Sequence, residues 1–106
     1  MGCIVVACYK PKTGQAQALR ELMRMHHSIL KSQGLVTTRE SIVMEAEDGT
    51  IVEVFEWASK EAIEVAHQNP VVAEMWDQYS RVCDYVPIAN VPEASQIFSQ
   101  FSPVVI

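Results

Sequence analysis

Two histidines on predicted helices are the side chains best suited to acid–base chemistry. His67 lies one helical turn after Ile63, so both should point toward the interior. An imidazole titrates near neutral pH and can act as a general base or donate a hydrogen bond to a ligand oxygen. A histidine near a helix C-terminus can also be structural, because it interacts favourably with the helix dipole. His67 is therefore a candidate catalytic residue with a structural alternative.

His26 is the second candidate base. It lies within the apolar stripe of the predicted helix 13–32, whereas His27 is offset from that stripe. A buried imidazole needs a hydrogen-bond partner, which is either a ligand or a protein group. Because neighbouring helical residues point about 100° apart, His26 and His27 cannot easily bind one metal ion. The sequence supports no metal site.

Aromatic side chains near these histidines could bind a planar substrate. Trp57 ends a predicted strand, and Trp76 and Tyr79 lie one turn apart on a predicted helix. Large rings can stack on a planar molecule, and Tyr79 would add a hydroxyl group. The alternative is core packing, because aromatic side chains dominate cores by area.

Glu53 is the unusual residue of the third predicted strand. It shares a face with Ile51, Phe55 and Trp57. If that face is buried, the carboxylate needs a partner or a raised pKa. Glu53 could accept a proton in the substrate site. The favoured alternative is an ion pair across the dimer with an Arg such as Arg39 on the neighbouring strand, since buried charges are usually paired.

The order of predicted elements indicates an α+β fold. Apolar patterning predicts strands at 3–9, 35–46 and 50–58, and an extended segment from Asp84. Helices are expected over 13–32, over 60–68 and from Pro70. This order is the ferredoxin-like β-α-β-β-α-β arrangement, with a four-stranded antiparallel sheet and helices on one face.

Polar residues mark the ends of these elements. Thr13, Ser59 and Asn69 are expected N-caps, and Pro70 suits the first helical position. Asp48-Gly49 predicts a two-residue hairpin turn in which both residues have positive φ.

The length of 106 residues predicts a single domain, residues 1–106. The third strand is apolar on both faces, so the sheet must be covered twice. Helices supply one cover, and a second subunit or a ligand supplies the other. We therefore expect a homodimer formed through the sheet face, and a tail, 93–106, that packs on the body or on the partner.

Composition excludes several classes of protein. The net charge of −5 argues against nucleic-acid binding, and no apolar run is long enough to span a membrane. The cysteines, Cys3, Cys8 and Cys83, are odd in number and form no CxxC pair, which predicts reduced thiols in a cytoplasmic protein. No flavin, haem, phosphate-loop or nucleophile signature is present, so no cofactor is expected.

The segment from Trp57 to Pro70 carries a resemblance to a known family. Its pattern W-x-S-x-E-A-x-x-x-A-H-x-x-P resembles the antibiotic biosynthesis monooxygenase superfamily, whose members are dimeric α+β barrels. Known members include cofactor-free oxygenases acting on aromatic quinols and haem-degrading enzymes. The haem-degrading members have an Asn on the first strand. Since the strand Ile4–Tyr9 has none, a haem-binding or haem-degrading function is disfavoured.

The resemblance implies a cofactor-independent monooxygenase that oxidises a small planar aromatic or quinol-type molecule. His67 or His26 would be the base, and Trp57, Trp76, Tyr79 and Glu53 would line the substrate site. The alternative is a non-catalytic dimer that binds a ligand or serves as a stress or interaction module. A cavity of about 300 Å³ or more would favour the enzyme.

Overall fold

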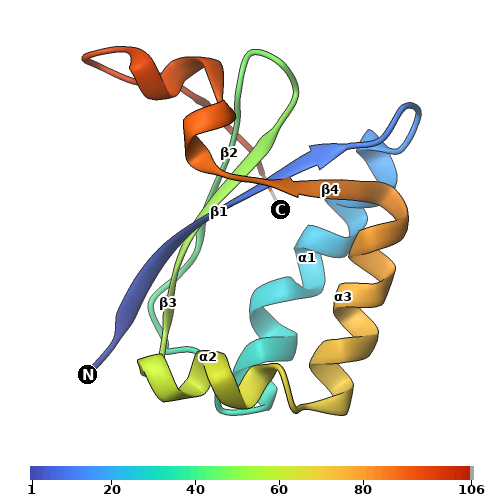
Figure 1. Ribbon diagram of the computed structural model, residues 1–106, viewed down its shortest axis with the longest axis vertical. Coiled ribbons are helices and arrows are strands. Elements are labelled where there is room, and N and C mark those ends of the chain that lie inside the picture. Colours follow the sequence, from blue (N-terminus) through green and yellow to red (C-terminus); the bar gives the residue numbers. More distant parts are fainter. Residues whose placement is uncertain (106) are drawn as a thin grey trace.

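The computed structural model describes residues 1–105 and has an α+β fold, which confirms the predicted class (Figure 1). Ile106 lies outside the described residues. Three α-helices accompany one antiparallel sheet, whose strand order is β4-β1-β3-β2-β5. The elements are β1 (Cys3–Pro11), α1 (Ala16–Ser32), β2 (Ile42–Glu45), β3 (Ile51–Trp57), α2 (Lys60–Ala66), α3 (Pro70–Val82), β4 (Cys83–Val86), the 3₁₀ turns η1 (Ile88–Asn90) and η2 (Pro92–Ser95), and β5 (Ser102–Pro103).

The centre of the sheet is the long antiparallel pair β1 and β3. They pair from Cys3 opposite Trp57 to Tyr9 opposite Ile51. The sheet has one strand more than predicted, because the chain returns along β2 as β5. The N–H of Val104 continues this contact by donating to the carbonyl of Val43 at 2.9 Å.

The helices cover one face of the sheet. α1 and α3 run side by side, and α2 crosses the end of the sheet where β3 finishes (Figure 1). The apolar stripe of each long helix faces the strands, so burial of these side chains drives the packing. The fully or nearly fully buried residues are Leu19, Met23, His26 and Leu30 on α1 and Val72, Met75 and Tyr79 on α3.

The opposite face of the sheet is only half covered. Val91 and Phe101, from the C-terminal segment (residues 87–105), pack over Cys8 and Val52. The other half, which we call the open half, is formed by apolar residues with exposed fractions of 56%, 48% and 61%. These residues are Ile4, Val6 and Ile42.

Two of the three predicted helix caps are confirmed. Ser59 Oγ accepts a hydrogen bond from the N–H of Ala62 at 3.0 Å. Asn69 Oδ1 accepts from the N–H groups of Val71 and Val72 at 2.9 and 3.2 Å. Each cap satisfies an N–H group that has no partner within the helix, and so fixes where the helix begins.

The prediction that Thr13 caps the first helix is wrong. α1 begins at Ala16, after an N-cap residue, Gln15, whose side chain makes no capping bond. The N–H of Gln15 donates to the carbonyl of Lys12 at 2.9 Å, and Gly14 has a φ of +77°. Lys12–Gln15 is therefore a tight turn that needs glycine at its third position, and it delays the helix.

The hairpin between β2 and β3 also differs from its prediction. Gly49 has a φ of +90°, whereas none of the described non-glycine residues has a positive φ. The N–H of Ala46 donates to the carbonyl of Thr50 at 2.8 Å, so the loop has three residues, Glu47–Gly49. Asp48 Oδ1 accepts from the N–H of Thr50 at 3.0 Å, and this side-chain bond favours the longer loop.

The second strand is shorter than the predicted 35–46. Regular pairing is confined to Ile42–Glu45, and Val36 forms an isolated bridge to Trp57. Between them Thr37 Oγ1 accepts from the N–H of Arg39 at 3.1 Å. Such local bonds from threonine compete with the sheet and bend the chain away from it.

Candidate functional site

A cavity of about 310 Å³ lies between the helix-facing side of the sheet and all three helices. This volume is at the lower end of the range of small-molecule sites. Most of its wall is carbon, and the polar groups at the wall are imidazoles, phenols and the indole N–H. The lining residues are Val5, Ala7, Tyr9, His26, Phe55, Trp57, Ile63, His67, Trp76 and Tyr85.

Behind this wall, the carboxylate of Glu53 is the centre of a buried hydrogen-bond network. The residue is 1% exposed. The hydroxyl of Tyr9 donates to Oε1 at 2.9 Å. His26 Nδ1 lies 3.0 Å from Oε1 and 3.2 Å from Oε2. An ionised Glu53 therefore has a donor at both oxygens, as a buried carboxylate requires.

Within the chain, Glu53 pairs with His26 and Tyr9, and not with the predicted Arg39. Glu53 faces the helices, whereas Glu56, on the opposite face of the strand, lies 3.2 Å from Arg39 Nε. Thr37 Oγ1 also donates to Glu56, at 2.9 Å. These bonds hold the pKa of the Glu56 carboxyl below its usual value. Strand parity placed Glu53 correctly, but its partner came from α1.

The ring of His26 is held on three sides. Its edge packs against Phe55 with ring centres 5.3 Å apart at 86°, and against Tyr79 at 5.5 Å and 64°. Glu53 fixes the Nδ1 side of the ring. Because an ionised carboxylate only accepts, Nδ1 carries the hydrogen and a neutral ring keeps its lone pair on Nε2. No hydrogen bond to Nε2 is made within residues 1–105.

His67 is held differently, as the C-cap residue of α2. Its Nδ1 lies 2.8 Å from the carbonyl oxygen of Ile63, the contact expected of a structural histidine at a helix end. The carbonyl can only accept, so the neutral ring again has its lone pair on Nε2. The ring also packs edge-on against Trp76, with centres 5.0 Å apart. His67 thus combines a structural contact with a place in the cavity wall.

The predicted aromatic residues divide into two groups. Trp57 and Trp76 line the cavity, and Trp57 also packs on Phe55 with ring centres 5.4 Å apart. Tyr79 is completely buried and does not line the cavity. Its hydroxyl points to Met23 Sδ at 3.3 Å, away from any ligand in this space. Tyr79 supports the rings around it.

Two tyrosines in the wall were not predicted. Burial and the neighbouring Glu53 charge raise the pKa of Tyr9 well above its usual value. Burial raises the pKa of Tyr85 to about 12. The strand register brings them side by side, with ring centres 5.5 Å apart. The alternation of side chains along β1 indicated which face of the sheet Tyr9 lies on. Only the register of β1 with β3 and β4 identifies the neighbours of Tyr9.

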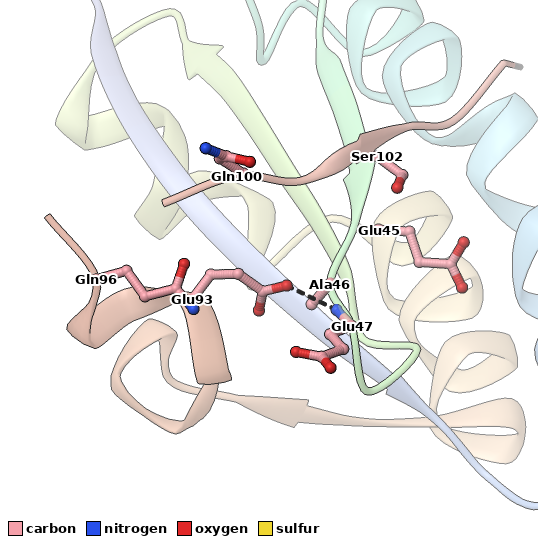
Figure 2. Close-up of a pocket in the computed structure, with 7 residues that line it drawn as sticks. All are labelled: Glu45, Ala46, Glu47, Glu93, Gln96, Gln100 and Ser102. Atoms are coloured by element: carbon pink, nitrogen blue, oxygen red, sulfur yellow. Dashed lines mark hydrogen bonds between the residues drawn. The ribbon is translucent and has the colours of Figure 1, made fainter. Parts of the chain in front are cut away.

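A second cavity, of about 490 Å³, lies between the β2–β3 hairpin and the C-terminal segment. Figure 2 shows Glu93 reaching from η2 toward the backbone of Glu47. None of the residues lining this polar cleft was a candidate from the sequence. They are Glu45, Ala46, Glu47, Glu93, Gln96, Gln100 and Ser102.

No family model, curated protein or solved structure matches this chain. Within residues 1–105, no three His, Cys, Asp or Glu side chains are grouped so that they could hold a metal ion. In the same residues, no helix has the length and apolar character needed to cross a membrane.

Proposed function

We propose that the inner cavity binds a small planar phenol or quinol and that the protein oxidises this molecule with O₂, without a cofactor. The observation that carries this proposal is the position of His26. Its ring forms part of an apolar wall and is oriented from behind by a buried carboxylate. A base held in this way is poised to remove a proton from a ligand in the cavity.

The first step would be deprotonation of the substrate hydroxyl by His26 Nε2. The Glu53 carboxylate keeps the required tautomer of His26 and stabilises the imidazolium that forms. Both side chains are buried, and the low dielectric around them strengthens this electrostatic interaction. Trp57 and Trp76 would hold the planar ring of the substrate.

The electrons for the oxygen step come from the substrate. In a substrate with hydrogen at the carbon para to the phenolate oxygen, this carbon forms a bond with O₂, and His26 returns its proton to give a hydroperoxide. Cleavage of the O–O bond with loss of the para hydrogen then gives a quinone and water. One phenol and one O₂ are consumed, one oxygen atom is retained, and O₂ is the oxidant.

Family membership and assembly are part of the same proposal. The resemblance of Trp57–Pro70 supports membership of the antibiotic biosynthesis monooxygenase superfamily, and the order β4-β1-β3-β2 supports a ferredoxin-like core. The three free cysteines support a reducing, cytoplasmic location. The open half of the sheet would be covered by a second copy of the chain.

Light scattering after size exclusion tests the assembly. We expect the mass of two chains for the wild type and of one chain for the double variant Val6→Lys, Ile42→Lys. Val65→Lys is the control, because Val65 is 54% exposed on α2, away from the open half. A monomeric wild type, or dimers in all three proteins, contradicts this assembly.

Oxygen uptake with dihydroxynaphthalenes tests the reaction. His26→Asn is the sharpest variant, because the asparagine amide can still donate to Glu53 while Nε2 is lost. We expect a fall of about 10²–10⁴-fold in kcat, the usual contribution of a general base. The matched variant His67→Asn keeps a donor toward Ile63 and should retain most activity.

Tryptophan fluorescence during the same titrations separates the enzyme from the non-catalytic module. Quenching on addition of the naphthalenediol, with no O₂ consumption above buffer, would favour a binding protein and contradict the oxygenase. Saturable quenching accompanied by uptake of one O₂ per substrate molecule supports the oxygenase.

A further inference from the structure

Glu93 has a buried carboxylate that the protein satisfies on one side only. The residue is 5% exposed. Oε2 accepts a hydrogen bond from the N–H of Glu47 at 2.7 Å. Oε1 is buried and has no partner within the described part of the chain. A buried carboxylate oxygen without a donor is costly, so a donor from outside the chain would stabilise this atom.

The cleft beside Glu93 is negatively charged. Glu45 is neutralised by Arg20, whose Nη2 lies 2.8 Å from Oε1 of Glu45. The side chain of Glu47 forms no ion pair with the residues that the structure describes. Glu47 and Glu93 therefore leave two negative charges uncompensated at one end of the cleft (Figure 2). Such a concentration of one charge sign attracts a cation.

We propose that this cleft binds a small organic cation through a primary ammonium or guanidinium group placed between Glu93 and Glu47. An ammonium or guanidinium group brings several N–H donors, which match the unpartnered Oε1 of Glu93. The amides of Gln96 and Gln100 and the hydroxyl of Ser102 would bind the polar remainder of the ligand.

The shape of the site favours an organic cation over a metal ion. The cleft volume of about 490 Å³ is within the range of sites for whole small molecules. Two of the lining groups are neutral amides, and the third acidic side chain of the lining, Glu45, already pairs with Arg20. The described residues also contain no cluster with the spacing needed for metal coordination.

Isothermal titration calorimetry with putrescine and agmatine tests the site, with butane-1,4-diol as the neutral compound of the same length as putrescine. We expect saturable binding of one amine per chain and none of the diol, at constant ionic strength. Glu93→Gln should weaken amine binding about ten- to hundredfold, the size of a lost charge-assisted hydrogen bond. Glu74→Gln, on the exposed side of α3, should bind as the wild type does.

Glu47→Gln gives a second test that does not depend on a buried residue, because Glu47 is exposed. It should weaken amine binding several-fold. Several results would overturn the proposal: equal heats for the diol and putrescine, equal heats for putrescine and NaCl of matched ionic strength, or unchanged amine affinity in both Glu93→Gln and Glu47→Gln. A crystal structure in putrescine with only a water at Glu93 Oε1 would also overturn it.

Discussion

Two glutamates, Glu53 and Glu93, are buried, and they differ in how fully the protein satisfies their carboxylate oxygens. Glu53, under the inner cavity, has a donor at each oxygen, from Tyr9 and His26. Glu93, beside the polar cleft, has a donor at one oxygen and none at the other within residues 1–105. The two residues are 1% and 5% exposed, so burial alone does not distinguish them.

The difference suggests two kinds of role. Every partner of Glu53 comes from the protein, so Glu53 is suited to orient another side chain, and His26 is the one that reaches a cavity. The unpartnered oxygen of Glu93 is suited to an external donor. A buried network whose members are all paired is rigid, whereas an incomplete one favours a partner that completes it.

The largest expected effect is on stability, from removal of Glu53. Glu53→Ala leaves Tyr9 and His26 without their shared acceptor, and we expect the free energy of unfolding to fall by about 3–5 kcal/mol. Urea denaturation measures this loss of unfolding free energy. Glu93→Ala removes a single bond, to Glu47, and should cost about 1 kcal/mol. Equal losses for the two variants would remove the distinction between the glutamates.

The same substitution at both positions makes a finer comparison. Glu53→Gln replaces an acceptor with a donor beside Tyr9 or His26, so it should lower the free energy of unfolding by about 1–3 kcal/mol. Glu93→Gln keeps the acceptor for the N–H of Glu47 and removes an unpaired charge. It should change the free energy of unfolding by less than about 0.5 kcal/mol. A larger loss for Glu93→Gln in urea would reverse the comparison.

Titration of the tyrosines detects the Glu53 charge and has the smallest expected effect. The chain has three tyrosines, and all have pKa values raised by burial, Tyr85 to about 12. Absorbance at 295 nm should show no ionisation of the folded protein near pH 10, where the urea-unfolded chain titrates. Glu53→Gln should lower the pKa of Tyr9, because the neighbouring negative charge is lost.

The raised pKa values of the tyrosines also determine how the free energy of unfolding changes with pH. A phenol whose pKa is higher in the folded state adds stability that is complete below about pH 10. For Tyr85 this contribution is lost as the pH rises through about 12. A normal titration of any tyrosine in the folded protein would contradict the buried environment described for it.

The sequence predicted the elements and the face of each strand more reliably than the contacts within the site. Residue types with a local mechanism, such as the caps Ser59 and Asn69, were placed correctly. The parity of β3 predicted that Glu53 shares a face with Ile51, Phe55 and Trp57, and this face is buried. The partners of Glu53 could not be predicted, because Tyr9 and His26 are 44 and 27 residues away and meet Glu53 only through the sheet register and helix packing.

The polar cleft was not predicted because nothing local indicates it. Glu93 follows Pro92 in a segment with no helical or strand periodicity, and its contact with the N–H of Glu47 joins residues 46 apart in the sequence. A single glutamate in such a segment is normally exposed. Its burial is a consequence of tertiary structure.

The most direct test of the central claim is O₂ consumption by the wild type and by His26→Asn with a dihydroxynaphthalene, alongside fluorescence measurements of ligand binding. The proposed function predicts one O₂ consumed per substrate molecule by the wild type. It also predicts a loss of about 10²–10⁴-fold in kcat for His26→Asn, with ligand binding retained. Equal O₂ uptake by the two proteins, or wild-type uptake no greater than that of buffer, would contradict the assignment of His26 as the base in an oxygenase.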